Sequence, residues 1–281
     1  MPDVAPRRRA QPVDVVRVDG DGIERRQDLA AAEEPLEIRL HGTPFVVTMR
    51  TPGLDRELAV GLLVSERIVA GVDDIALIRH CGAATDEGEE NVLDVTLAGD
   101  AAIRADAALA GRRLVVTSAA CGVCGRRSID DLLQHLAPVT AGWSMPAAVA
   151  AALPARLRDA QAVFDETGGL HAAALFDRHG TLVASAEDVG RHNAVDKVIG
   201  GQLLADRWPL GDRVLFVSGR TSFEIVQKAV VAGIPIVGAV SAPSSLAVDL
   251  ARAAGVTLLG FVRGEAFNIY AGEQRIEAGA G

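Results

Sequence analysis

Cysteine and aromatic residues are scarce in this sequence. Three cysteines occur among 281 residues, and phenylalanine, tryptophan and tyrosine together make up 4% of the chain. A small and odd number of cysteines argues against an extracellular disulfide framework. Charges and prolines interrupt residues 1–15, which therefore lack the apolar stretch of a secretory signal. These absences predict a cytoplasmic protein with free thiols.

Positive charge and long apolar runs are also in short supply. The 37 aspartates and glutamates outnumber the 28 lysines and arginines, and the net charge is −9. This balance argues against broad nucleic-acid binding, which needs a basic surface to displace counterions. The most apolar stretch, 229–240, is broken by Gly233 and Pro235, far short of the roughly 18 residues that span a bilayer. We therefore expect neither nucleic acid nor membrane as a partner.

The apolar fraction of 49% is enough for a sizeable core. A chain of this length forms one large domain or two modest ones. We expect a disordered tail over 1–12, an N-terminal α+β region over 13–145 and a C-terminal α/β domain over 146–281. The boundary is placed in the turn-rich segment 138–146.

Hydrophobic periodicity and turn residues predict the individual elements. In the N-terminal region we expect strands at 13–18, 36–40, 45–50, 92–97 and 113–118, and helices at 54–69 and after Ser128. In the C-terminal half we expect strands at 163–165, 172–176, 182–186, 214–217, 234–240 and 257–262. The intervening helices are predicted at 193–204, 221–232 and 244–254, the second opened by a Thr221–Glu224 capping box. Alternating helices and nearly all-apolar strands predict a parallel sheet covered on both faces.

The sequence Cys121-Gly-Val-Cys124-Gly is the most informative motif. A structural zinc site needs four ligands, and no second cysteine pair is present. A disulfide exchanger would place its first cysteine at the start of a helix, whereas this pair precedes the expected cap at Ser128. A sulfur carrier needs a reachable, partly ionised cysteine on a flexible segment. The carrier and redox interpretations both remain open from the motif alone.

The residues around the pair favour thiolate chemistry over two inert buried cysteines. Arg126, Arg127 and the nearby helix N-terminus stabilise a negatively charged sulfur. Gly122 and Gly125 allow the backbone to bend toward different partners. The third cysteine, Cys81, is interpreted as a small core residue.

Polar residues follow several predicted strands of the C-terminal half. Arg191 and His192 precede an apolar helix, and Arg220 lies in a loop between a strand and a helix, a setting that suits phosphate binding. Arg263 follows the last predicted strand. Ligands of open α/β sheets bind at the carboxyl ends of the strands, so these loops together predict a pocket for an anionic ligand. His171 either lines this pocket or is a core histidine, and the second interpretation is our expectation.

Several ordered segments together resemble the FdhD/NarQ family of formate dehydrogenase accessory sulfurtransferases. The segments that carry the resemblance are 34–38, 49–53, 121–125, 167–171, 187–197, 218–220 and 261–264. They extend the resemblance from about residue 13 to residue 275. Because the motifs are many and ordered, this signal is far more specific than the cysteine pair.

The resemblance implies a sulfur carrier for the molybdenum cofactor in its bis-guanine-dinucleotide form. Sulfur would pass from a cysteine desulfurase to Cys121 as a persulfide, and then to the cofactor before its insertion into formate dehydrogenase. Cys124 matches the second family cysteine and would assist transfer or protect against oxidation. The family's cofactor-binding stretch matches Phe261, Val262, Arg263, Gly264, Glu265 and Ala266. Arg220, Arg191 and His192 are further candidate pocket residues.

The family also implies a C-terminal three-layer α/β/α fold like that of cytidine deaminases, and a homodimer. Zinc deaminases carry His-x-Glu and Pro-Cys-x-x-Cys motifs. Here Ala172 and Ala173 follow His171, and alanine precedes Cys121. We therefore expect the fold without catalytic zinc. A chaperone that binds the cofactor without carrying sulfur, and a dithiol oxidoreductase, are the competing hypotheses.

Overall fold

The computed structural model describes residues 9–20, 22–81, 91–111 and 138–278. In the N-terminal half, four strands form a sheet in the order β4-β3-β6-β5. Its elements are β3 (Glu34–Leu40), β4 (Thr43–Arg50), α1 (Asp55–Ser65), η1 (Val72–Asp74), β5 (Ile75–His80), β6 (Val92–Leu97) and α2 (Gly99–Gly111). The expected strands at 36–40, 45–50 and 92–97 and the helix beginning near residue 54 are confirmed.

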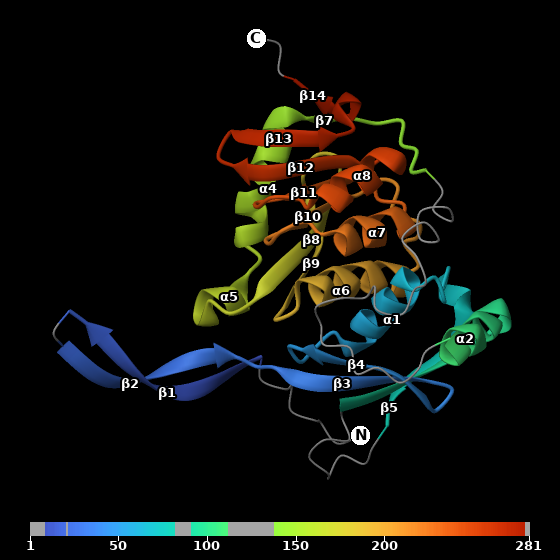
Figure 1. The fold of residues 1–281 in the computed structure, drawn as a ribbon, viewed down its shortest axis with the longest axis horizontal. Coiled ribbons are helices and arrows are strands. Elements are labelled where there is room, and N and C mark those ends of the chain that lie inside the picture. Colours follow the sequence, from blue (N-terminus) through green and yellow to red (C-terminus); the bar gives the residue numbers. More distant parts are fainter. Residues whose placement is uncertain (1–8, 21, 82–90, 112–137, 279–281) are drawn as a thin grey trace.

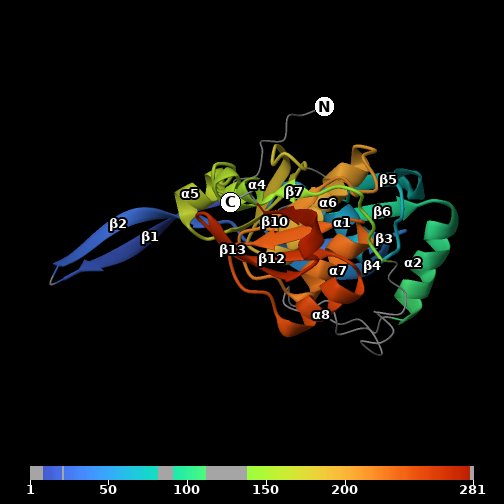
Figure 2. The same cartoon turned by 90° about the horizontal axis from the view of Figure 1, so that it is seen from above.

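A two-stranded ribbon precedes this sheet and projects from the body of the molecule (Figures 1 and 2). It consists of β1 (Ala10–Asp19) and β2 (Gly22–Ala31), which pair antiparallel from Ala10 opposite Ala31 to Asp19 opposite Gly22. The expected disordered tail is therefore wrong for residues 10–12, because their backbone pairs with β2.

The C-terminal half is built on a six-stranded sheet in the order β13-β12-β11-β10-β8-β9. The strands are β8 (His171–Phe176), β9 (Leu182–Asp188), β10 (Val214–Val217), β11 (Ile236–Ala239), β12 (Thr257–Arg263) and β13 (Ala266–Ala271). The helices are α4 (Ala147–Arg158), α5 (Ala162–Thr167), α6 (Arg191–Leu204), α7 (Phe223–Val231) and α8 (Ser245–Ala253). Short elements complete it: β7 (Met145–Pro146), η3 (Glu273–Arg275) and β14 (Ile276–Glu277).

The sheet separates two layers of helices (Figure 1). Side chains of Leu215 and Val217 join the core on the side of α6, α7 and α8, whereas Val214 and Phe216 join the core on the side of α4. This alternation follows from the two-residue period of a strand, and it explains why β10 is apolar at every position. The expected three-layer α/β/α arrangement is confirmed.

Three sequence-based expectations need correction. The sheet is mixed, because β8, β9 and β13 run antiparallel to their neighbours while β10, β11 and β12 are parallel. The strand expected at 163–165 is wrong, since these residues belong to α5, whose amides at Val163 and Phe164 donate to the Glu187 carboxylate at 3.0 and 2.7 Å. The capping box is wrong, because α7 is preceded by Ser222, and Glu224 pairs with His192 instead.

Helices α1 and α6 join the two halves of the molecule. An added Cβ at Gly61 would lie 1.9 Å from the carbonyl oxygen of Asp196, and one at Gly200 would lie 2.0 Å from that of Glu57. Only glycine permits backbones to approach this closely. At the same crossing, the Ser65 hydroxyl donates to the Asp196 carboxylate at 2.9 Å. The hydrophobic core on this side therefore contains residues of both halves.

Among the residues that the structure describes, no helix is long and apolar enough to cross a membrane.

Candidate functional site

One edge of the large sheet collects most of the predicted pocket residues. The carboxyl ends of β10, β11 and β12 lie there because these strands are parallel. Strand β8 is antiparallel to β10, so its first residue, His171, lies at the same edge, opposite Asp188 at the end of β9. Two residues separate the end of β9 from Arg191, which begins α6, and Arg220 lies in the loop that follows β10. The fold thus brings together residues that are distant in sequence, such as His171 and Arg220, which are 49 positions apart.

His192 is held between two polar side chains of the neighbouring helix start. Its Nε2 atom lies 3.1 Å from the Ser222 hydroxyl and 2.9 Å from the Glu224 carboxylate. Only 8% of the residue is exposed. The imidazole therefore links the first turn of α6 to the first turn of α7 and fixes the two loops relative to each other.

Positive charge concentrates around His171. A Cβ added to Gly219 would lie 3.3 Å from His171 Nδ1 and 4.0 Å from Arg191 Cδ, so these side chains flank the same glycine. Burial lowers the pKa of His171, and the charges of Arg191, His192 and Arg220 lower it further. Arg191 Nε is buried and has no hydrogen-bond partner among the described residues. The positive charges and the Arg191 Nε–H at this edge are suited to binding an anion.

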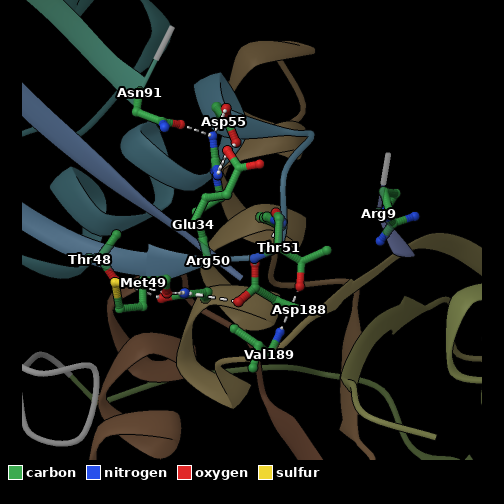
Figure 3. A network of polar contacts seen from close by, with 12 residues as sticks. Arg9, Glu34, Thr48, Met49, Arg50, Thr51, Asp55, Asn91, Asp188 and Val189 are labelled. Carbon is green, nitrogen blue, oxygen red and sulfur yellow. Dashed lines mark hydrogen bonds and ion pairs between the residues drawn. The ribbon is translucent and has the colours of Figure 1, made fainter. Parts of the chain in front are cut away.

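Asp188 anchors the turn between β9 and α6, immediately before Arg191 and His192. Its buried carboxylate lies 2.6 Å from Lys197 Nζ. It accepts from the Thr51 amide at 3.1 Å (Figure 3). It also accepts from the Gly190 amide at 2.8 Å and from Asn193 Nδ2 at 2.9 Å. Four donors satisfy a carboxylate that would otherwise be costly to bury.

Lys197 completes the connection to the N-terminal half. Its ammonium donates to the Thr51 carbonyl at 2.8 Å, and no part of its side chain is exposed. Burial lowers the pKa of Lys197, and the negative charge of Asp188 partly counteracts this effect. Since Thr51 follows β4 directly, the ion pair fixes the end of the small sheet to the edge of the large one.

Arg50, beside Thr51, is the centre of a second network (Figure 3). It forms two hydrogen bonds with the Asp55 carboxylate, at 2.9 and 3.0 Å, and lies 3.3 Å from Glu34. Its guanidinium also donates to Asn91 at 2.9 Å. The sequence reasoning missed Arg50, Asp188 and Lys197 as site-organising residues. Charged residues inside predicted strands and helices could have pointed to these networks. Their partners, however, are distant in sequence and could not be identified from it.

The predicted cofactor stretch, residues 261–266, covers the end of β12, the turn that follows it and the first residue of β13. Phe261 is exposed at a positive φ of 53°, and the Arg263 guanidinium lies 5.9 Å from the centroid of its ring. Arg263 Nε donates to the Val240 carbonyl at 3.1 Å, which directs the side chain over the end of β11. Gly264, Glu265 and Ala266 are exposed, whereas the Val262 side chain is buried in the core beside α4. Val262 can therefore contact a ligand only through its backbone.

Cys121 and Cys124 lie outside the described residues, as do the predicted strand at 113–118 and the helix after Ser128. Cys81 is described and is a free, half-buried thiol whose backbone amide donates to the Val92 carbonyl at 2.9 Å. In the part of the chain that the structure covers, no group of three or more histidine, cysteine, aspartate or glutamate residues is arranged to hold a metal ion.

Comparisons with known proteins agree with one another across nearly the whole chain. The FdhD/NarQ family model matches residues 31–277. A sulfur carrier protein FdhD from Anaeromyxobacter dehalogenans strain 2CP-C is 56% identical over 258 residues, which is 89% of each chain. One of the same description from Mycobacterium tuberculosis is 50% identical over 274 residues, covering 93% of this chain and 96% of the relative.

A solved structure supports the fold. A crystal structure assigned as a formate dehydrogenase accessory protein from Desulfotalea psychrophila aligns with a TM-score of 0.75 at 24% identity, covering 95% of this chain and 99% of that one. The family model spans well over half of the sequence, and the relatives far exceed the similarity expected by chance. The chain belongs to the FdhD/NarQ family.

Proposed function

We propose that this protein is a sulfur carrier for the maturation of formate dehydrogenase, with Cys121 as the carrying residue. The observation that carries the proposal is the similarity, at 50–56% identity, to relatives described as sulfur carrier proteins. The arginines at the edge of the large sheet support it, because a cofactor with two guanine dinucleotides carries several negatively charged phosphate groups. Cytoplasmic location follows from the need for a reduced thiol.

The first chemical step is a thiol–persulfide exchange. The Cys121 thiolate attacks the outer sulfur of a persulfide on a cysteine desulfurase, and the desulfurase cysteine leaves as a thiolate. One S–S bond forms and one breaks, so the step needs no external electrons. Cys121 then bears the transferred sulfur as a persulfide.

Delivery to the molybdenum centre as sulfide needs two electrons, which Cys124 supplies. The Cys124 thiolate attacks the inner sulfur of the persulfide, forms a disulfide with Cys121 and releases hydrosulfide toward the metal. A cytoplasmic dithiol reductant then restores both thiols. This assigns Cys124 the role of assisting transfer, subordinate to that of Cys121.

The cofactor is the substrate of this reaction, and we propose that its phosphate and guanine groups bind at the sheet edge. Arg263 and the exposed backbone around Gly264 form one side of the site. Arg191, His192 and Arg220 form the other, with the unpartnered Arg191 Nε available as a donor. A local cationic pocket is compatible with a net charge of −9, because the electrostatic potential in a pocket depends mainly on the charges that line it and less on the net charge of the protein.

Intact-protein mass spectrometry tests the carrier role. An active cysteine desulfurase with cysteine should add one sulfur mass to the wild-type protein and to Cys81→Ala, the matched control, but not to Cys121→Ala. Cys124→Ala should load sulfur and fail to release it. No adduct on the wild type would overturn the proposal. Full activation of formate dehydrogenase by Cys121→Ala would instead favour a cofactor-binding chaperone, and reduction of protein disulfides without loading would favour a dithiol oxidoreductase.

We further propose a homodimer. Light scattering of the purified protein should give a mass near twice 29.3 kDa. A mass of a single chain across the accessible concentration range would contradict this.

A further inference from the structure

His171 is a half-buried imidazole at the centre of the cationic edge. As the first residue of β8 it lies beside Gly219, and a Cβ added to that glycine would contact both His171 and Arg191. Neither of its ring nitrogens has a hydrogen-bond partner within the described part of the chain. A core histidine normally satisfies at least one nitrogen, so the expectation of a satisfied core residue does not fit this geometry.

The elements packed around His171 carry an excess of positive charge. Helix α6 contributes Arg191 and His192, and the loop after β10 contributes Arg220. The carboxylate of Asp188 on β9 faces the same histidine, but Lys197 and three further donors already engage it.

Two further carboxylates, on α7 and β9, are engaged as well. Glu224 on α7 pairs with His192 at 2.9 Å. Glu187 on β9 accepts from two amides of α5, at 3.0 and 2.7 Å, and its backbone carbonyl accepts from Arg9 at 3.1 Å. Asp188 therefore only partly opposes the effect of the two arginines, because its carboxylate is already shared among four other donors.

We propose that His171 is a further phosphate-binding residue, which contacts the anionic ligand as an imidazolium and takes up its proton when that ligand binds. This inference rests on the proposed binding of a phosphate-rich cofactor at the same edge. Without a ligand, the surrounding cations and partial burial keep His171 neutral. A bound phosphate or pyrophosphate cancels their repulsion and accepts a charge-assisted hydrogen bond from the ring.

Proton uptake by His171 makes the affinity for the anion depend on pH. Between the pKa values of His171 in the free and bound states, affinity for the anion falls by up to about tenfold for each unit that pH rises. A ligand without a negative charge at this position experiences no such dependence. His171 would therefore select for anionic groups such as phosphate as well as contribute to affinity.

Isothermal titration calorimetry with GDP tests the proposal. Binding is measured at one pH in two buffers of different ionisation enthalpy, which yields the number of protons taken up. The wild type should take up a fraction of a proton that His171→Gln loses, with affinity weakened several-fold. His179→Gln is the matched control, because His179 is exposed beyond the opposite end of the same strand and should behave as the wild type. Titration of the GDP phosphate itself is common to all variants and cancels in the comparison.

Two results overturn the inference in distinguishable ways. GDP binding by the wild type without proton uptake, or with uptake that His171→Gln retains, overturns the role of His171 and leaves the proposed pocket intact. No GDP binding by the wild type overturns the pocket and the role of His171 together. An NMR titration of the imidazole provides a second readout, since GDP should shift the His171 midpoint upward even if affinity changes little.

Discussion

The N-terminal half contains one exposed region, the β1–β2 ribbon, and one buried region, the contact between α1 and α6. The ribbon extends from the body and leaves Val18 and Ile23, which pair at its tip, 68% and 76% exposed. At the α1–α6 contact, glycine brings two backbones together and charged side chains are fully buried. From this difference we expect the surroundings of a residue, rather than its chemical type, to determine its tolerance to substitution. The same residue types are expected to be dispensable in one region and indispensable in the other.

The largest effect is expected from breaking the buried pair that supports the contact. Lys197→Met leaves Asp188 buried without its counter-charge, which costs about 3–5 kcal/mol in the free energy of unfolding. Urea denaturation measures this loss. Arg17→Ala is the control, because Arg17 and Asp19 form an exposed pair at 3.5 Å on the ribbon and should contribute about 0.5 kcal/mol or less. Equal losses in both variants would contradict the comparison.

A single methyl group should separate α1 from α6. Gly61→Ala places its Cβ against the backbone of Asp196, so the helices must move apart, at a cost of about 1–3 kcal/mol or more. Thermal unfolding followed by circular dichroism measures the loss. Gly71→Ala serves as the matched change, since Gly71 has an extended backbone and no atom within 4 Å of an added Cβ. An unchanged melting temperature for Gly61→Ala would show that the helices are not in close contact in solution.

The pH dependence of stability should report His171. Its pKa is lowered in the folded state, so the unfolded state binds more protons as pH falls below the ordinary value of about 6.5. This contribution to stability is present above that pH and is lost as pH falls toward the folded-state pKa. Urea midpoints across this range should change less for His171→Gln than for the wild type. A steeper dependence in the variant would mean that His171 is charged in the free protein.

The smallest effect is expected at the tip of the ribbon. Replacing both Val18 and Ile23 by threonine removes little buried apolar surface, and the free energy of unfolding should change by about 0.5 kcal/mol or less. Denaturation at several protein concentrations measures this. A large loss that grows on dilution would show that a second copy of the chain covers the ribbon, and would sharpen the comparison by adding an interface to it.

The strands of the large sheet could be predicted because they are buried on both faces. Residues 214–217 are apolar throughout and form β10 with those bounds. Strand β2 was missed because its 10 residues include Glu24, Arg25, Arg26 and Asp28, which face solvent on both sides of the ribbon. Local pattern could not place α5 either, since its first amides depend on the carboxylate of Glu187 in a later strand.

The candidate site was predicted in part. The loops after the strands and their arginines could be placed at one edge, because parallel strands share a carboxyl end. The links from Thr51 to Asp188 and Lys197 join residues 137 and 146 positions apart, and no sequence period reports such a contact. The roles of Cys121 and Cys124 rest on the family resemblance and on thiol chemistry.

The shared core around α1 and α6 has a practical consequence for handling this protein. A fragment that begins at residue 146 would carry the complete large sheet, yet it would present the apolar surface of α6 and the ionic groups of Asp188 and Lys197 to water. The complementary fragment would lose the surface on which α1 rests. The chain is therefore best expressed whole rather than as two fragments. Tags and insertions are best confined to the turn between β1 and β2.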